Sequence, residues 1–259
     1  VAIYINGTNM KEVTELTIPT SVTSIADYAF YMNRVVTVSI PASCTEIGNY
    51  AFEDCQKLES VTFAEGSKLT AIGAGAFLRC YYMTTCDLPD SVRTLGDSVF
   101  NCCTYLSSCT IPEGVTELPS YLFYYCSSLK EVNLPSTLTT IGYGAFDTCG
   151  IESLTIPEGV TTIGGVAFYG SSLSEISLPS TLTSIGRYGF AETKLTQITL
   201  NDGLESIGDM AFYASPLTEL TIPDSVTSVG SNVVSSCSYL TTLNIGAGVQ
   251  DLYQPICYD

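Results

Sequence analysis

Residues 173–190 read L-S-E-I-S-L-P-S-T-L-T-S-I-G-R-Y-G-F, and the same pattern recurs along most of the chain. Its last residue marks the period, because a phenylalanine returns every 22 to 25 residues. This series, here called the phenylalanine ladder, comprises Phe30, Phe52, Phe77, Phe100, Phe123, Phe146, Phe168, Phe190 and Phe212, and Val234 continues it. A fixed period of this length predicts stacked coils that share one continuous core.

Each part of the pattern predicts a local structure. Apolar residues two apart, as at Ile176 and Leu178, predict a strand with alternate side chains facing inward. The following proline ends the strand and begins a turn, because it lacks an N–H donor. A glycine recurs at the position of Gly186 in most repeats, a set that we call the glycine column, and we expect these glycines to need a positive φ. We also expect aspartates beside this column, such as Asp209, to cap a short helical turn that carries the phenylalanine.

The runs Leu178-Pro179-Ser180-Thr181-Leu182-Thr183-Ser184-Ile185-Gly186 and Ile141-Gly142-Tyr143-Gly144-Ala145-Phe146-Asp147-Thr148-Cys149 resemble the BspA-type (Treponema pallidum-type) leucine-rich repeats. The resemblance covers about residues 13–245. It implies a mainly β, right-handed leucine-rich-repeat solenoid, here of about eleven coils of 22–25 residues, with one parallel sheet and short helical turns. We expect a single repeat domain over 1–259, with an N-terminal cap at 1–12 and a C-terminal coil or cap at 246–259.

The composition limits the chemistry. The chain has no histidine, which excludes histidine-based catalytic triads and dyads and histidine-containing zinc sites. Nine Lys and Arg against 26 Asp and Glu give a net charge of −17, which repels nucleic acids and anionic lipids. No apolar run approaches the ~18 residues that span a bilayer. We therefore predict no catalytic residue, no metal, no cofactor, no nucleic-acid partner and no membrane insertion.

Most of the eleven cysteines follow the repeat. A column three residues after the ladder holds Cys55, Cys80, Cys103, Cys126, Cys149 and Cys237, and elsewhere it holds Asn, Ser or Thr. This alternation predicts a buried row of small polar side chains with free thiols, comparable to the asparagine ladder of other leucine-rich repeats. Spacing of the CxxC kind is absent, which argues against a zinc site of stacked thiolates.

Tyrosines flank the phenylalanine ladder and are candidates for a binding function. Rigid, amphipathic tyrosine side chains suit the docking of a protein or glycan, although they also serve to shield the edge of the ladder. A sparse acidic row lies on the outward face of the predicted strands. The candidate binding residues are therefore Tyr105, Tyr121, Tyr124, Tyr125, Tyr169 and Tyr213, together with Glu131, Glu175 and Glu219.

The resemblance implies a non-enzymatic interaction or adhesion scaffold, secreted or on the cell surface of a bacterium, and some members of the family bind host matrix proteins. The sequence begins at Val1 without a leader, so either the protein is cytoplasmic or a leader precedes this stretch; the resemblance favours the second. We expect a monomer that binds a host protein, a protein of a neighbouring cell, or a glycan. The alternatives are a structural spacer of a larger surface protein and a polysaccharide-acting β-helix enzyme. The enzyme is disfavoured because the largest insertion, near Glu65, adds only two residues.

Overall fold

The structure is a computed structural model that describes residues 4–5, 8–9, 13–250 and 255–257. Two compact units are present: unit 1 comprises Val1–Val115 and Leu122–Asn133, and unit 2 comprises Thr116–Tyr121 and Leu134–Asp259. The single-domain organisation stays a prediction. Of the two predicted caps, residues 1–3, 6–7, 10–12, 251–254 and 258–259 lie outside the described part. The remainder of the N-terminal segment pairs β1 (Tyr4–Ile5) with β2 (Thr8–Asn9) as antiparallel strands.

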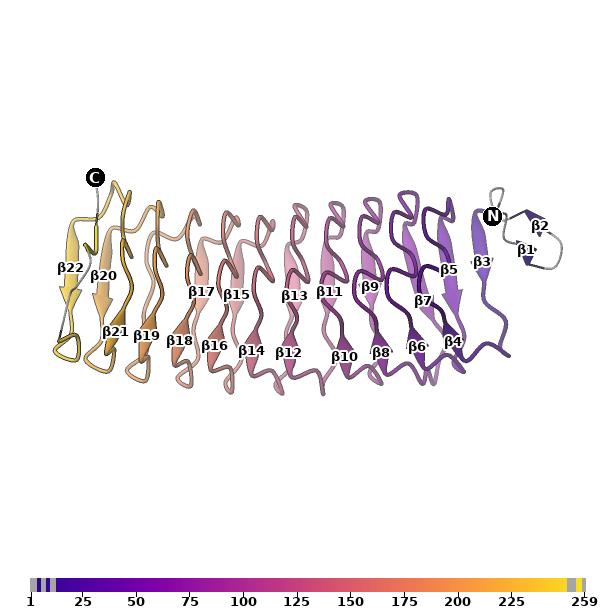
Figure 1. The fold of residues 1–259 in the computed structure, drawn as a ribbon, viewed down its shortest axis with the longest axis horizontal. Helices are drawn as coiled ribbons and strands as arrows, with labels where there is room; N and C mark the ends of the chain where they lie inside the picture. The colour runs from indigo at the N-terminus through magenta and orange to yellow at the C-terminus, as the bar shows by residue number, and fades with distance from the viewer. Residues whose placement is uncertain (1–3, 6–7, 10–12, 251–254, 258–259) are drawn as a thin grey trace. The chain divides into compact units, whose positions relative to one another are not determined.

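Unit 1 contains two rows of short parallel strands. The first strand of each coil follows the predicted apolar pattern and is hydrogen-bonded to its equivalents in neighbouring coils; this row comprises β3 (Glu15–Thr17), β5 (Thr37–Ile40), β7 (Ser60–Phe63), β9 (Thr85–Asp87), β11 (Ser108–Thr110) and β13 (Glu131–Asn133). The second row lies on the return side of the coils and comprises β4 (Ser24–Ile25), β6 (Glu46–Ile47), β8 (Ala71–Ile72) and β10 (Thr94–Leu95). In Figure 1 the second row is drawn in the stronger colour, nearer to the viewer.

Unit 2 repeats this arrangement. Its second strands form one six-stranded parallel sheet of β12 (Glu117–Leu118), β14 (Thr140–Ile141), β16 (Thr162–Ile163), β18 (Ser184–Ile185), β19 (Ser206–Ile207) and β21 (Ser228–Val229). Its first strands pair as β15 (Ser153–Thr155) with β17 (Glu175–Ser177), and as β20 (Glu219–Ile222) with β22 (Thr242–Ile245). The expected strand near Ile198 is missing, yet Leu200 is still buried, so the inward packing continues without ladder pairing.

The protein is therefore a mainly β, parallel-strand solenoid of about ten coils. The first-strand row corresponds to the predicted parallel sheet, but its strands are hydrogen-bonded as three separate sheets: one of six strands in unit 1 and two pairs in unit 2. The second row is an addition that the sequence analysis did not anticipate. Each of these two-residue strands has one outward and one inward residue, as at Ser184 and Ile185. A strand of two residues is too short to show the period-two alternation by which a strand is recognised in a sequence.

The phenylalanine ladder forms the centre of the core. All nine members are buried, eight of them completely. In unit 1 the rings of Phe30 and Phe52 stack with centroids 5.0 Å apart, and in unit 2 those of Phe146 and Phe168 stack at 5.2 Å. One coil presents its ring face to the next, so burial of these rings depends on neighbouring coils.

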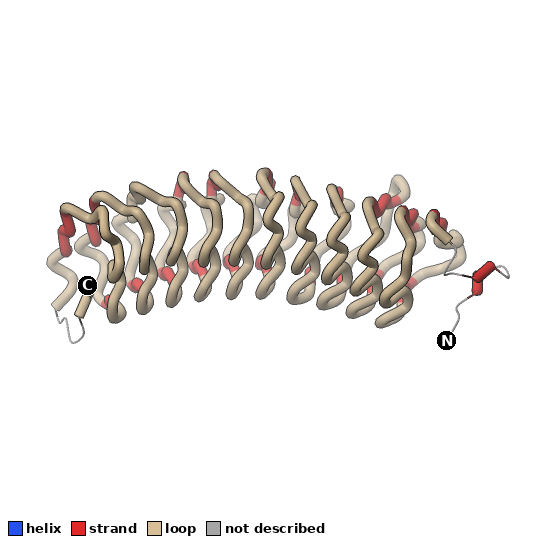
Figure 2. Tube along the Cα trace, turned by 90° about the horizontal axis from the view of Figure 1, so that it is seen from above, coloured by secondary structure: helices blue, strands red, loops and turns tan. Residues whose placement is uncertain are grey.

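The predicted helical turns are wrong, since no described residue is helical, and Figure 2 shows only strands and loops. An α-helix requires each N–H to donate to the carbonyl four residues earlier. Here alternate N–H groups donate to the next coil instead: Tyr188 to Asp209 at 2.9 Å and Phe190 to Ala211 at 2.8 Å. The N–H of Ala191, the next residue, closes a tight turn on the Tyr188 carbonyl at 3.1 Å, and Tyr188 has a φ of 56°.

The glycine column has a different cause from the one predicted. Gly186 and its equivalents do not have a positive φ. A Cβ atom at Gly186 would lie 2.5 Å from the backbone nitrogen of Gly165 in the preceding coil, so the column exists because adjacent backbones approach closely. The predicted aspartate caps are wrong for the same reason that helices are absent: Asp209 Oδ1 accepts from the Ser231 N–H of the next coil at 2.7 Å.

The cysteine column forms the predicted buried row. Thiols of one coil donate to the phenylalanine carbonyl of the preceding coil, for example Cys55 to Phe30 at 3.1 Å and Cys80 to Phe52 at 3.2 Å. The Ser215 hydroxyl makes the equivalent bond to Phe190 at 2.8 Å, which explains why cysteine and serine alternate in this column. All eleven cysteines are recorded as free thiols.

Candidate binding groove

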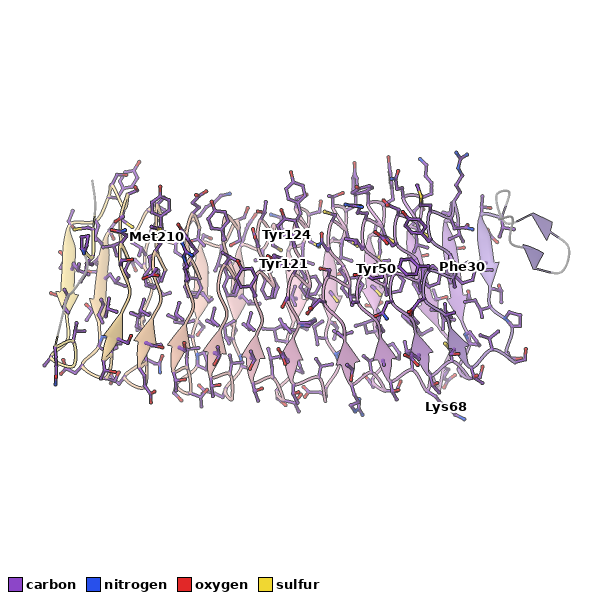
Figure 3. All side chains as sticks on the ribbon, viewed as in Figure 1. Phe30, Tyr50, Lys68, Tyr121, Tyr124 and Met210 are labelled. Atoms are coloured by element: carbon purple, nitrogen blue, oxygen red, sulfur yellow. The ribbon has the colours of Figure 1, made fainter. Side chains whose placement is uncertain are left out.

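An open groove of about 460 Å³ lies beside the phenylalanine ladder of unit 2. Its lining comes from the residues that immediately flank the ladder: Tyr121, Tyr143, Asp147, Val166, Tyr169, Tyr188, Glu192, Met210 and Tyr213. We call it the tyrosine groove. Figure 3 labels two of its members, Tyr121 and Met210, in the upper half of the view, above the row of strands β12 to β21.

The tight turns around the ladder place these side chains. Tyr121 and Tyr188 stand two residues before a ladder phenylalanine, whereas Tyr169 and Tyr213 directly follow one. Tyr121 and Tyr188 adopt positive φ values of 57° and 56°, a region that non-glycine residues occupy uncommonly. The N–H groups of Tyr121 and Tyr188 bond to the next coil. This backbone conformation therefore directs both side chains away from the core and toward the surface.

Small residues in neighbouring coils make room for two of the rings. A Cβ atom on Gly144 would lie 2.7 Å from Cδ1 of Tyr121, and one on Gly165 would lie 3.1 Å from Cε2 of Tyr143. Each ring therefore rests directly on the backbone of the following coil. The sequence thus pairs a tyrosine in one coil with a glycine in the next, and this pairing fixes the orientation of both rings.

The rings of the groove meet edge to face. Tyr121 and Tyr143 have centroids 5.3 Å apart with planes inclined at 72°, and Tyr188 lies 6.1 Å from Tyr169 and 6.2 Å from Tyr213 at 86° and 84°. Other surface tyrosines of the chain stack face to face, among them Tyr82 on Tyr105 with planes 11° apart. In each edge-to-face pair, the ring that presents its edge keeps both of its faces clear of its neighbour, so the groove offers π faces to a ligand.

Two carboxylates lie among these rings. Glu192 Oε1 accepts a hydrogen bond from the Tyr169 hydroxyl at 2.6 Å, and this bond, together with burial, raises the pKa of Tyr169 to about 12. Asp147 is half-buried and accepts from Thr148 Oγ1 at 2.8 Å. Burial raises the pKa of Asp147, and the Thr148 hydrogen bond lowers it in part. Tyr169 thus remains a hydrogen-bond donor at any physiological pH.

The structure brings only three of the nine predicted binding residues together. Tyr121, Tyr169 and Tyr213 line the tyrosine groove. In unit 1, Tyr105 stacks on Tyr82, and the rings of Tyr124 and Tyr125 lie 6.0 Å apart. The acidic residues are all exposed at the start of first strands, on β13 for Glu131, on β17 for Glu175 and on β20 for Glu219, and none of them lines the groove.

Sequence reasoning missed the other half of the lining. Tyr143 stands three residues before its phenylalanine, outside the two columns in which tyrosine recurs. Asp147 occupies the same column as Tyr169 and Tyr213, and this shared column was the available signal. Glu192 is recognisable only from its hydrogen bond to Tyr169, which joins two coils.

The described part of the chain contains neither a metal-binding cluster nor a membrane-spanning helix. No cluster of three or more Cys, Asp or Glu there could hold a metal. The described residues also contain no helix long and apolar enough to cross a bilayer. The groove contributes aromatic faces, hydroxyl groups and two carboxylates.

Stacked parallel strands around a phenylalanine ladder define a leucine-rich repeat protein. The model of the BspA type leucine rich repeat region matches in six copies, over residues 8–80, 66–173 and 161–259. The chain belongs to this family. Members of the leucine-rich repeat family are typically protein-interaction scaffolds. The comparison with curated proteins gives no match.

Several crystal structures share the fold. A leucine-rich repeat protein from Bacteroides ovatus is 29% identical with a TM-score of 0.82; the match covers 90% of this chain and 63% of that protein's length. A leucine rich cell surface protein from Faecalibacterium prausnitzii is 25% identical, with a TM-score of 0.54 and coverage of 92% and 88%. The leucine-rich repeat protein of T. pallidum, at 22% identity, a TM-score of 0.52 and coverage of 90% and 80%, shows the fold alone.

Proposed function

We propose that this chain is a non-enzymatic protein-binding scaffold that is secreted or displayed on the surface of a bacterial cell. The tyrosine groove of unit 2 is its docking site. The observation that carries the proposal is the convergence of five tyrosines, Met210 and two carboxylates on one groove outside the core. Aromatic residues and methionine are enriched in protein interfaces relative to the rest of the surface.

The surface location is supported by family and relatives. The chain belongs to the BspA-type repeats, and the similar Faecalibacterium prausnitzii protein is described as a cell surface protein. A net charge of −17 suits a molecule that stays soluble and apart from its own copies, and we propose that it acts as a monomer. Host matrix proteins and proteins of neighbouring cells are the proposed partners.

The test is direct binding with purified components. The immobilised protein is screened by surface plasmon resonance against a panel of purified extracellular matrix proteins and, in parallel, on a glycan array. The variant Tyr169→Ser/Tyr213→Ser removes two rings of the groove. We expect wild type to bind a protein of the panel and the variant to bind about tenfold or more weakly, because truncated interface tyrosines each cost on the order of 1–2 kcal/mol.

Two matched variants locate the effect. Tyr239→Ser removes a tyrosine of unit 2 that is 65% exposed and lies outside the groove, and it should bind as wild type does. Tyr124→Ser/Tyr125→Ser tests the tyrosine pair of unit 1. Circular dichroism confirms that each variant is folded. If the chain binds no protein of the panel, the result favours the structural spacer. If a partner binds the groove variant as tightly as it binds wild type, the result refutes the proposed site.

A further inference from the structure

The lining of the tyrosine groove is acidic, and Arg187 lies against the ring of one of its tyrosines, Tyr188. The lining itself contains two carboxylates and no lysine or arginine. Within the described part of the chain, Asp147 and Glu192 form no ion pair, unlike Glu53 and Asp54 of unit 1, which both pair with Arg79. Asp147 is also half-buried, which makes an unpaired negative charge there costly and a cationic ligand favourable.

Two tyrosine faces of this protein already hold cations, one of them in the groove itself and the other in unit 1. The Arg187 guanidinium carbon lies 5.0 Å from the ring centroid of Tyr188, and Lys57 Nζ lies 5.0 Å from that of Tyr82. The negative face of an aromatic ring attracts a cation at this distance. Because the rings of the groove meet edge to face, they offer similar faces beside Asp147 and Glu192.

The spacing of the rings suits an extended chain. Tyr169, Tyr188 and Tyr213 follow one another at 6.1 and 6.2 Å. Alternate side chains of an extended peptide are about 6.6 Å apart, since each residue advances the chain by about 3.3 Å. A peptide laid across the coils would therefore meet successive rings with every second side chain.

We propose that the groove binds an extended basic segment of a partner protein, with arginine or lysine side chains against the tyrosine faces and Asp147 and Glu192 as counterions. This inference rests on the proposed function and specifies the partner's chemistry. The net charge of −17 supports it further, because it speeds the approach of a positively charged segment.

The test uses three defined peptides. A fluorescein-labelled twelve-residue peptide carries arginine at alternate positions between glycine and serine; a second carries citrulline, the uncharged isostere of arginine, and a third carries glutamine at those positions. Binding is measured by fluorescence anisotropy at low salt. We expect the arginine peptide to bind and both neutral peptides to bind about tenfold or more weakly, because they lose the cation–π and ionic contacts together.

Conservative variants then separate the groove from the general charge of the chain. Asp147→Asn and Glu192→Gln preserve the shape of the side chain and remove its charge, and each should weaken binding of the arginine peptide about fivefold. Asp202→Asn removes an exposed carboxylate of unit 2 outside the groove and should leave affinity unchanged. Equal binding of the citrulline peptide overturns the inference, and so does an equal loss in Asp202→Asn.

The two proposals fail in different ways. If binding of a matrix protein depends on Tyr169 and Tyr213 while the arginine peptide binds no better than the neutral peptides, the result supports the docking site and refutes the basic segment as its ligand. A matrix protein that binds Tyr169→Ser/Tyr213→Ser normally refutes the docking site itself, whatever the peptides do. Preferential binding to the glycan array, unaffected by Asp147→Asn, shows a carbohydrate ligand and also overturns the basic segment.

Discussion

Buried cysteines illustrate how one residue column serves the fold. Thiols of this column fill a small space and satisfy a phenylalanine carbonyl of the preceding coil, as Cys55 does at 3.1 Å and Cys237 at 3.1 Å. Burial raises the pKa of Cys55 to about 12, and it raises that of Cys80 and Cys103 well above the usual range. Such thiols are poor nucleophiles, because the thiolate is the reactive form. Their role is structural.

This burial predicts a loss of stability at alkaline pH. In the folded chain Cys55 stays protonated up to about pH 12, whereas in the unfolded chain a thiol ionises near pH 8.5. Between these values the unfolded state binds fewer protons, so the free energy of unfolding falls as pH rises, by up to about 1.4 kcal/mol per pH unit for each such thiol. Urea unfolding followed by circular dichroism at pH 8, 9 and 10 measures the slope.

The control is Cys55→Ser, since serine occupies the same column at Ser171 and Ser215 and does not titrate. Tyrosines ionise in the same range and contribute equally to both proteins. The difference between the two slopes therefore isolates the thiol. Identical slopes in wild type and variant would show that Cys55 is not held protonated by burial.

At the scale of the coil, close backbone approach is the requirement that the sequence pattern encodes. Gly186 donates its N–H to the Ile163 carbonyl of the preceding coil at 2.8 Å, and its Cα faces the Gly165 backbone. Stacking of coils at this distance leaves no space for a side chain. The glycine column is consequently a packing feature of the interface between coils.

We predict that Gly186→Ala destabilises unit 2 by about 1–3 kcal/mol, because the added methyl group forces apart backbones that cannot yield locally. Thermal unfolding followed by circular dichroism measures the change. Gly203→Ala is the matched control, since its nearest contacts would lie at 3.2 Å, compared with 2.5 Å at Gly186, and it should lose less stability. An unchanged midpoint for Gly186→Ala would contradict the close approach.

Much of the coil was predictable from the sequence, and the limits are physical. The phenylalanine ladder, the inward apolar columns and the proline turns follow from side-chain volume and backbone restriction, as at Pro179 and Phe190. The turns were mistaken for helices because a one-coil pattern does not reveal that Phe190 N–H bonds to the next coil. The groove was only partly predictable, since the ring of Tyr143 is positioned by Gly165, which lies in another coil.

At the scale of the whole molecule, repetition separates structure from function. Positions that recur in every coil maintain the core, so a binding site is expected where coils differ from one another. Tyr143, Asp147 and Glu192 differ from the residues that other coils carry in the same columns, and they meet in one groove of unit 2. The net charge of −17 favours the approach of a basic partner and disfavours self-association.

The most direct test of the tyrosine groove is a hydroxyl-radical footprint of the whole chain, alone and saturated with the matrix protein that binds it in the panel. Mass spectrometry reports the oxidation of each tyrosine and methionine. We predict that oxidation falls at Tyr143, Tyr169, Tyr213 and Met210, and stays unchanged at Tyr82, Tyr105 and Tyr239. Unchanged oxidation in the groove, with protection at any other surface, would contradict the account.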